Sequence, residues 1–323
     1  MRKIVGLMMC VVLMCSIVFV GCGDREESTD KKRTVRICQS GVYVGATSII
    51  MEKKGILEKH LPENVNVEWS QIATGPDIRD AILSGSVDIA DFSLMTFITG
   101  YENGLPIDLL SFSGSTPIYL YANSNDIEEI DDFNEKSSIS ITNKNTNLHL
   151  AVLALCKREL GNAVALDNNL TAIPAADAIA SLQTSSDFDG AVFSFPMSVK
   201  ADEIENLKQM YDMSDLIKEY SIGSVIVASR DFCKTNADIT KAFLGAQEET
   251  IEYISKNKEE TAEILSNAFG CEKEDVLYAL EVMPPTNKVE GYDKMAQLLY
   301  EAGILEREPA KFNTLENYDD IVK

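Results

Sequence analysis

The chain has 323 residues, of which 45% are hydrophobic and 25% charged, and its 51 acidic side chains outnumber 29 basic ones for a net charge of −22. A protein of this charge is a poor partner for nucleic acid, whose binding depends on lysine and arginine contacts to phosphate, so no nucleic acid partner is expected. The length exceeds one typical domain and suits two.

The first 22 residues have the pattern of a bacterial export signal. Arg2 and Lys3 precede an uncharged apolar run over 4–21, which ends in small residues before Cys22. A basic start, an apolar core and small residues before a cleavage point are typical of such a signal. An uncleaved transmembrane helix is the alternative, since about 17 to 25 apolar residues can span a bilayer. Both interpretations place the rest of the chain outside the cytoplasm.

The end of this run also resembles a bacterial lipobox, Phe-Val-Gly-Cys over 19–22. In proteins with that motif the cysteine is acylated and becomes the new N-terminus, so the resemblance implies a lipid anchor on Cys22. Residues 23–33 are polar and without periodicity, which predicts a flexible tether. After residue 33 the chain keeps 23 of its basic and 47 of its acidic side chains, a net charge of −24.

Strand and helix patterns then alternate. Strands are expected over 34–39, 65–69, 87–92 and 107–112, and helices from about 49 to 60 and over 77–83. Such alternation predicts a parallel sheet covered by helices on both faces.

The series then begins again, with strands over 138–142, 170–173 and 188–193 and helices over 148–160 and 174–183. Each series ends in an Asp-x-Ala sequence, at Asp88 and at Asp189, which are 101 positions apart. The openings at Ile37 and Ile141 are 104 apart. We therefore expect two similar lobes, 34–120 with 225–323 and 121–224.

The segments 117–123 and 221–229 are apolar and β-rich, and we expect them to cross between the lobes as a two-strand hinge. Helices expected over 237–269, 272–283 and 293–302 would cover the outer face of the first lobe.

A ligand site is expected at the loops that leave the strands. In doubly wound sheets the crevice lies beyond the carboxyl ends of the strands, where helix N-termini offer free N–H groups. These loops are rich in hydroxyls and amides and poor in charge, although helix capping alone also favours such residues. Tyr43 and Phe195 are placed to sandwich a planar group from opposite lobes, or to serve as core or gate. The ligand-binding candidates are Gln39, Ser40, Tyr43, Thr74, Gly75, Ser93, Met95, Ser113, Asn145, Thr146, Asn147 and Phe195.

Nothing in the sequence indicates catalysis, a metal or a cofactor. Only His60 and His149 are available, with an approach of His149 to the cleft left open, and no nucleophile, phosphate-loop or metalloprotease motif occurs. Cys38, Cys156, Cys233 and Cys271 could form two disulfides, but they are dispersed, and buried free thiols are expected.

Six segments together resemble one family, the substrate-binding lipoproteins of bacterial ABC importers of the nitrate, sulfonate and taurine type, which includes thiamine-pyrimidine binders. They are 51–58, 67–69, 74–77, 83–90, 175–182 and 189–191. The resemblance implies a two-lobed type II periplasmic-binding-protein fold, with a mixed, mainly parallel sheet in each lobe. It further implies a monomer that closes on a small molecule and delivers it to membrane permease subunits.

Two departures bear on the ligand. The family often has Trp or Asp beside the proline where this chain has Ser-Phe-Pro at 194–196, and a Gly/Ser-rich turn where it has Asn-Thr-Asn at 145–147. Neither supplies a cation for an oxyanion. Nitrate, sulfonate, taurine and a nitrogen heterocycle all remain open, and an organic ligand contacted by Tyr43 and Phe195 is favoured.

Two other functions fit the sequence less well. An enzyme of the pyrimidine-synthase type needs iron-binding histidines and a cysteine-rich motif, which this composition does not offer. A surface sensor would need a further membrane or signalling segment after residue 22, and none is indicated. The importer-binding function is therefore the expectation.

Overall fold

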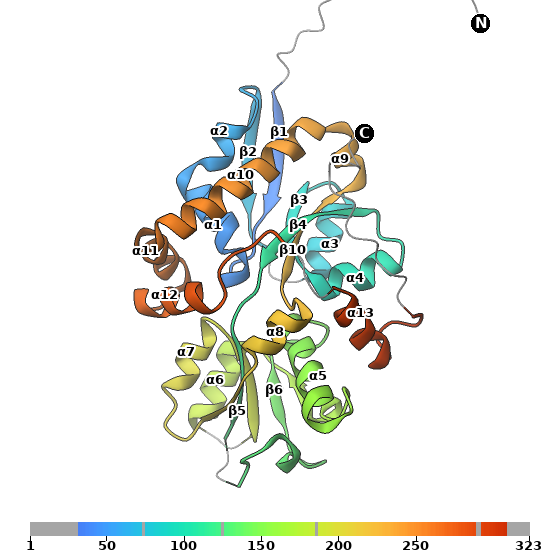
Figure 1. Cartoon of the computed structure of the whole chain (residues 1–323), viewed down its shortest axis with the longest axis vertical. Helices are drawn as coiled ribbons and strands as arrows, with labels where there is room; N and C mark the ends of the chain where they lie inside the picture. The colour runs from blue at the N-terminus through green and yellow to red at the C-terminus, as the bar shows by residue number, and fades with distance from the viewer. Residues whose placement is uncertain (1–31, 73–74, 124–125, 185–186, 289–291, 309–323) are drawn as a thin grey trace, which may run out of the picture.

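The structure is a computed structural model that describes residues 32–72, 75–123, 126–184, 187–288 and 292–308. Two lobes are stacked along its long axis (Figure 1). Cys22, the predicted signal and most of the predicted tether lie outside the described residues, as does Thr74. Within the described ranges, no helix combines the length and apolarity that crossing a bilayer requires.

The first lobe is built on a five-stranded sheet in the order β2-β1-β3-β10-β4. Its strands are β1 Arg33–Cys38, β2 Val65–Ser70, β3 Ile89–Ser93, β4 Ile107–Gly114 and β10 Ser224–Ser229. Strand β1 pairs in parallel with β2 and β3, while β10 runs antiparallel between β3 and β4. The central strands are apolar on both sides because helices cover both faces of the sheet.

One face of this sheet packs against α1, α2 and α10, and the other against α3 and α4 (Figure 1). These helices are α1 Ala46–Lys54, α2 Ile56–His60, α3 Gly75–Leu83, α4 Leu94–Glu102 and α10 Ala237–Lys256, with the short α9 Arg230–Thr235 before α10. The single helix expected up to residue 60 is two helices, because Gly55 adopts a left-handed conformation with φ of 59° between them.

The second lobe repeats this plan with the sheet order β7-β6-β8-β5-β9. Its strands are β5 Ile118–Ala122, β6 Ile139–Ile141, β7 Leu170–Ala172, β8 Gly190–Ser194 and β9 Lys208–Asp212. Its helices are α5 Asn147–Leu160, α6 Ala175–Thr184, α7 Met197–Asp202 and α8 Ser214–Tyr220. Short 3-10 turns lie at η1 Tyr43–Gly45, η2 Ile130–Asp132 and η3 Asp167–Asn169.

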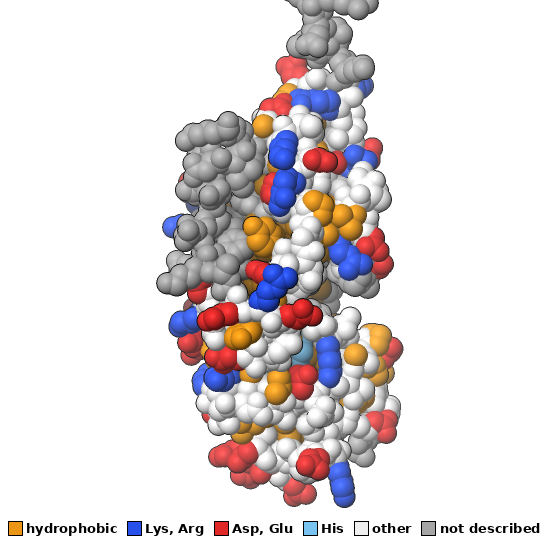
Figure 2. All heavy atoms as spheres, turned by 90° about the vertical axis from the view of Figure 1, so that its right-hand side faces the viewer, with side chains coloured by type: hydrophobic (Ala, Val, Ile, Leu, Met, Phe, Trp, Pro, Cys, Tyr) orange, Lys and Arg blue, Asp and Glu red, His pale blue; other side chains and the backbone are white. Residues whose placement is uncertain are grey.

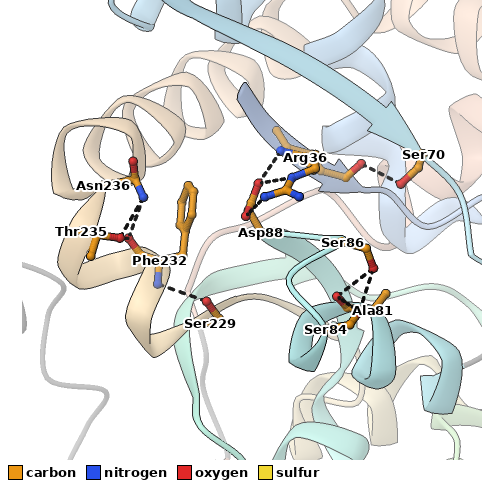
Figure 3. A network of polar contacts seen from close by, with 11 residues as sticks. Arg36, Ser70, Ala81, Ser84, Ser86, Asp88, Ser229, Phe232, Thr235 and Asn236 are labelled. Atoms are coloured by element: carbon orange, nitrogen blue, oxygen red, sulfur yellow. Dashed lines mark hydrogen bonds and ion pairs between the residues drawn. The ribbon is translucent and has the colours of Figure 1, made fainter. Parts of the chain in front are cut away.

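The repeat predicted from the spacing of Asp88 and Asp189 is present in atomic detail. The Asp88 carboxylate accepts a hydrogen bond from the backbone N–H of Arg36 at 2.8 Å, and the backbone N–H of Asp88 donates to the Arg36 carbonyl oxygen. Asp189 does the same with Ser138, also at 2.8 Å. In the first lobe the Arg36 guanidinium adds two bonds to Asp88 (Figure 3). Each aspartate thus ties the start of its strand to the neighbouring parallel strand.

The predicted two-strand hinge differs from the structure in one respect. Strands β5 and β10 are interior members of the two sheets, and the chain crosses between the lobes over the shorter segments 115–117 and 221–223. Because β5 and β10 run against their neighbours, each sheet has two parallel and two antiparallel pairings.

The C-terminal helices divide between the lobes. They are α11 Lys258–Phe269, α12 Lys273–Val282 and α13 Tyr292–Glu301. Helices α10 and α11 pack on α1, as expected, but α13 contacts α8 of the second lobe. Its Lys294 pairs with Glu219 at 3.0 Å and its Glu301 with Lys157 at 2.9 Å. The expectation that all of these helices cover the first lobe is therefore wrong for α13, whose apolar side finds a partner on α8.

The four cysteines after the tether are free, as expected. Cys38, Cys156 and Cys233 are buried and Cys271 is half-buried. Burial raises the pKa of Cys156 to about 11 and that of Cys233 to about 12, so both stay protonated thiols near neutral pH.

Candidate functional site

A buried carboxylate organises the loops at the carboxyl ends of the first sheet. Asp91, on the central strand β3, is only 4% exposed. One of its oxygens accepts the backbone N–H of Ser40 at 3.1 Å, and the other accepts the hydroxyl of Ser113 at 2.5 Å. The hydroxyl of Ser48, in the first turn of α1, acts to lower the pKa of Asp91. Asp91 therefore joins the loop after β1 to the last residues of β4.

Burial raises the pKa of Asp91 to about 6, against the opposing effect of its hydrogen bonds. Within the described part of the chain, no lysine, arginine or histidine forms an ion pair with it. The hydroxyl of Ser113 also lies 2.8 Å from the carbonyl oxygen of Val44. A hydroxyl has one proton, so it can serve both acceptors only when Asp91 itself carries a proton and donates to Ser113. This arrangement agrees with the raised pKa.

Several predicted site residues of the first lobe lie inside the fold. Gln39 is 6% exposed and donates to Glu52 at 2.8 Å, while its own Oε1 has no partner among the described atoms. Tyr43 is 2% exposed and donates to the carbonyl oxygen of Met283 at 3.0 Å, and its burial raises the pKa of its phenol. Met95 is fully buried in α4. We call the loops at the carboxyl ends of the strands of each sheet the rim of that lobe. These three side chains pack beneath the rim of the first lobe and are not exposed on its surface.

In the second lobe His149 shapes the predicted polar turn. Asn145 has a left-handed φ of 60°, and its N–H donates to His149 Nδ1 at 3.1 Å. Because Nδ1 accepts, Nε2 carries the proton and donates to Asp167 at 2.7 Å. Lys144 donates to the Asp167 carbonyl at 2.6 Å. The histidine approaches the cleft only through the loop that it positions, and both ring nitrogens are occupied.

The two rims meet across the junction between the lobes. Ser93, at the end of β3, donates to Asn147 Oδ1 at the start of α5, at 3.0 Å. The rings of Tyr43 and Phe195 lie 5.4 Å apart at 88°, and the ring of Phe269 lies 6.4 Å from the first and 6.2 Å from the second. The predicted approach of Tyr43 and Phe195 from opposite lobes is present, but edge to face, which leaves no room for a planar group between them.

The remaining candidates lie on the rims without meeting a partner across the junction. Thr146 donates to the Asn143 carbonyl at 2.9 Å, which closes its own turn. Gly75 is the first residue of α3 and is half-buried. A hollow of ≈ 290 Å³ lies where the lobes join, and Ser115 and Ser221 from both chain crossings line it.

Three residues at this place were missed from the sequence: Asp91, Phe269 and Met283, the last of which contributes its backbone carbonyl oxygen. The two apolar ones belong to helical segments whose stripes predicted core packing, so no signal distinguished them. For Asp91 there was a signal, because an acid interrupts the otherwise apolar strand Ile-Ala-Asp-Phe. In the described part of the chain, no three potential metal ligands are grouped together.

No protein-family model and no curated protein matches this sequence. Solved structures do match. The ligand-binding component of an ABC-type import system from Staphylococcus aureus, with zinc bound, has a TM-score of 0.70 at 15% identity, over 90% of this chain and 96% of that one. The periplasmic aliphatic sulphonate binding protein SsuA from Escherichia coli has a TM-score of 0.69 at 19% identity, over 90% and 92%.

A third match, the CA3427 gene product of Candida albicans, is described as having the generic periplasmic binding protein fold. Its TM-score is 0.70 at 17% identity, over 90% of this chain and 96% of that one. Likeness at these identities establishes the fold. The chain has the two-lobed periplasmic binding protein fold, with five strands in each sheet.

Proposed function

We propose that the chain is the extracytoplasmic, lipid-anchored solute-binding component of an ABC importer. The observation that carries the proposal is the convergence of polar and aromatic residues from both lobes at one junction, where Ser93 meets Asn147 and Tyr43 meets Phe195. The Staphylococcus and Escherichia proteins of this fold are named as ligand-binding and sulphonate-binding proteins.

The mechanism is capture by closure of the lobes. Each lobe has its own sheet and helices; the short segments 115–117 and 221–223 pass between them, and the C-terminal helix α13 packs on α8 of the second lobe. Among the described residues, the Ser93–Asn147 hydrogen bond and the Tyr43–Phe195 ring contact join the two sides of the site, and each such contact contributes about 1 kcal/mol. A ligand that adds contacts to both rims shifts the population towards the closed form, which is the form presented to the permease.

The cargo is a small organic molecule, either sulfonate- or taurine-like or a nitrogen heterocycle, and it leaves unchanged. No nucleophile–base pair is assembled among the described site residues, since both nitrogens of His149 are already bonded within the loop. The protein acts as a monomer, without cofactor or nucleic acid. On the face seen in Figure 2, acidic and basic side chains are scattered over both lobes, without a continuous basic surface.

A thermal-shift screen of the full-length protein, purified from membranes in detergent, tests binding. The probes are sulfonates, taurine, nitrate, pyrimidines and flavins. A ligand at a hundred times its Kd stabilises the fold by about 2.7 kcal/mol, so a true ligand gives a clear, saturable shift. Stabilisation by none of them, together with turnover of one, contradicts the proposal and favours an enzyme.

The lipid anchor is tested separately with Cys22→Ser. The variant should be misprocessed or released from the membrane, while the affinity of the folded part for its ligand stays unchanged. Cys15→Ser is the matched control, because it makes the same exchange within the apolar run and should leave anchoring intact. Equal release of both variants, or retention of both, contradicts a lipid on Cys22.

A further inference from the structure

The hollow at the junction of the lobes is a cavity beside the predicted ligand site and not part of it. Its volume of ≈ 290 Å³ is near the lower end of the range for small-molecule pockets. None of the residues predicted for the ligand site is among those that line it. Met283 stands between the two places, because it lines the hollow while its carbonyl oxygen accepts the Tyr43 hydroxyl at 3.0 Å.

The walls of the hollow come from both lobes. The second lobe contributes Ile217 and Lys218 of α8, a helix that lies beside the junction (Figure 1). The first lobe contributes Phe112 near the end of β4 and residues of the segment 282–288, in which α12 ends. The Phe112 N–H donates to the Asn287 carbonyl oxygen at 3.3 Å, which ties that segment to β4. A molecule in the hollow therefore contacts both lobes at once.

The polar side chains that line the hollow are suited to an anion. They are two lysines, Lys218 and Lys288, and three hydroxyls, on Ser115, Ser221 and Thr286. None of the described lining residues is an aspartate or a glutamate, although the chain has 51 acidic side chains. A lysine ammonium offers three donors and no acceptor, and each hydroxyl can donate as well. The lining thus presents positive charge and donors without a competing carboxylate.

Most of these donors are not engaged within the described part of the chain. Lys218 and Lys288 are exposed, and neither forms an ion pair with a described acid. Glu219, the acid next to Lys218, is already paired with a lysine of α13 at 3.0 Å. The hydroxyl of Ser115 has no partner among the described residues. The Thr286 hydroxyl accepts the Lys288 N–H at 3.2 Å, and its own proton has no described acceptor.

The apolar part of the lining favours an organic molecule over a bare ion. Phe112, Ile217 and Val282 line the hollow together with Pro284 and Pro285. Two consecutive prolines fix the backbone φ of this wall, so little of its conformational freedom is left to be lost on binding. A carbon skeleton packed against these side chains is removed from water, which adds to the attraction of the lysines.

We propose that the hollow binds a small organic dianion, whose charges are held by Lys218 from the second lobe and Lys288 from the first. The inference goes beyond the proposed function, because the cargo binds at the rims and the dianion at a second site beside them. A dianion held by both lobes favours the arrangement in which both lysines reach it. The net charge of −22 repels anions in general, so such binding reports the local site.

The test uses matched probes on the full-length protein in detergent, by calorimetry at pH 7.5 and low ionic strength. Succinate, succinamate and succinamide share one skeleton and carry two, one and no negative charges. Glycerol phosphate, with glycerol as its neutral counterpart, is the arm in which both charges lie on one group. The wild type should bind succinate or glycerol phosphate saturably. The bound dianion should be at least about fivefold tighter than its less charged counterpart, a difference of about 1 kcal/mol.

Lys218→Gln and Lys288→Gln each remove one of the two positive charges. Each should weaken the bound dianion about fivefold, and where succinate binds, each should bring it to within twofold of succinamate. Lys200→Gln is the matched control, because it makes the same exchange at an exposed lysine of α7 that does not line the hollow. It should leave the affinity within twofold. All three lysines are exposed, so the midpoint of thermal unfolding should be the same in all variants.

The outcomes that overturn this inference differ from those that overturn the proposed function. Binding of neither dianion above its less charged counterpart overturns the second site, and so does an equal effect of the Lys218, Lys288 and Lys200 variants. The cargo is tested by the thermal-shift screen. A cargo from that screen that binds the wild type and Lys218→Gln alike supports two separate sites. A cargo whose binding is lost in Lys218→Gln shows that the hollow is the cargo site itself, which overturns the second site and leaves a binding protein.

Discussion

The two central strands β3 and β8 are the same element used twice. From Asp88 the first reads Asp-Ile-Ala-Asp-Phe-Ser, and from Asp189 the second reads Asp-Gly-Ala-Val-Phe-Ser. Strand β3 pairs in parallel with β1 and β8 with β6, and each pairs antiparallel with the strand that follows a chain crossing, β10 for β3 and β5 for β8. Four of six residues are identical, so the two differences show what each lobe needs for itself.

At the first difference the Ile89 side chain fills the space beside β3, whereas beside Gly190 of β8 the corresponding space is filled by the Phe133 ring. Ile89 is fully buried between the sheet and the α1, α2 and α10 face. At Gly190 a Cβ would lie 2.8 Å from both the Phe133 ring and the Tyr121 carbonyl oxygen. At the second difference Asp91, which is hydrogen-bonded to the Ser40 N–H and the Ser113 hydroxyl, occupies the position where Val192 is fully buried beside Leu120. The second lobe builds the matching strand with an apolar side chain at this position, so a sheet of this kind does not by itself require the acid that the first lobe has.

The largest effect is expected from copying that charge into the second lobe. Val192→Asp would bury a carboxylate without the serine partners of Asp91, at a cost on the order of 4 kcal/mol. Urea unfolding measures the loss. Val192→Ala, which removes only apolar contacts, is the control and should cost about half as much. A loss below about 1 kcal/mol for Val192→Asp would mean that the second lobe tolerates a buried carboxylate as well as the first does. It would contradict the conclusion that the two lobes differ in this respect.

Removing the charge from the first lobe should stabilise it. The folded-state pKa of Asp91, about 6, lies above the unfolded value of 3.8, so the folded protein binds the proton more tightly. Its contribution to stability is therefore present below pH 3.8 and falls as pH rises towards 6. Asp91→Asn, which can donate to Ser113 as the protonated acid does, should raise the free energy of unfolding at pH 7.5 by up to about 3 kcal/mol.

The same comparison at lower pH is the internal control for Asp91→Asn. The gain should shrink as pH falls from 6 towards 4 and vanish once the wild-type carboxyl is protonated. A gain that stays constant over this range, or a loss at pH 7.5, contradicts a raised pKa at Asp91.

The close packing around Gly190 predicts a loss of stability that is smaller than that of Val192→Asp and that arises from steric overlap instead of a buried charge. Gly190→Ala should destabilise the protein by about 2 kcal/mol, because Phe133 or the β5 backbone must move. Gly75→Ala is the matched control, since the nearest atom to its added Cβ, on Thr96, is 3.7 Å away and its effect should stay within about 0.5 kcal/mol. Equal effects in urea unfolding would show that the space is not filled as described.

The sequence predicted what depends on local pattern and on the repeat. The spacing of Asp88 and Asp189 gave two similar lobes, and the apolar alternation gave nearly every strand within a few residues. The position of α13 on α8 was not predictable, because an amphipathic stripe does not say which surface it covers. The same holds for Phe269, whose pairing with Tyr43 depends on how two distant segments pack.

The sequence predicted which loops lie at the site but not which side chains contact one another there. Strand ends in α/β sheets indicate the rim by topology alone, which is why Ser40, Ser93 and Asn147 were found. The inward turn of Gln39, Tyr43 and Met95 depends on tertiary packing, which no local pattern specifies. Asp91 was recognisable as an acid within an apolar strand, and the comparison with Val192 at the matching position of the second lobe makes it clearer.

The smallest effect is expected at the hydrogen bond that joins the rims. Ser93→Ala removes the donor to Asn147, a loss of about 1 kcal/mol that acts on the closed arrangement of the lobes and not on either core. Such a change shifts the closed-to-open ratio about fivefold. Small-angle scattering of the unliganded protein should therefore show a larger radius of gyration, with an unchanged midpoint of urea unfolding. Ser194→Ala removes the corresponding hydroxyl at the end of β8, for which the described residues show no such partner across the junction, and should change neither quantity. A fall in the unfolding midpoint for Ser93→Ala alone would mean that this hydroxyl stabilises the first lobe itself. The difference between the two serines would then lie within their own lobes and not in the contact between the lobes.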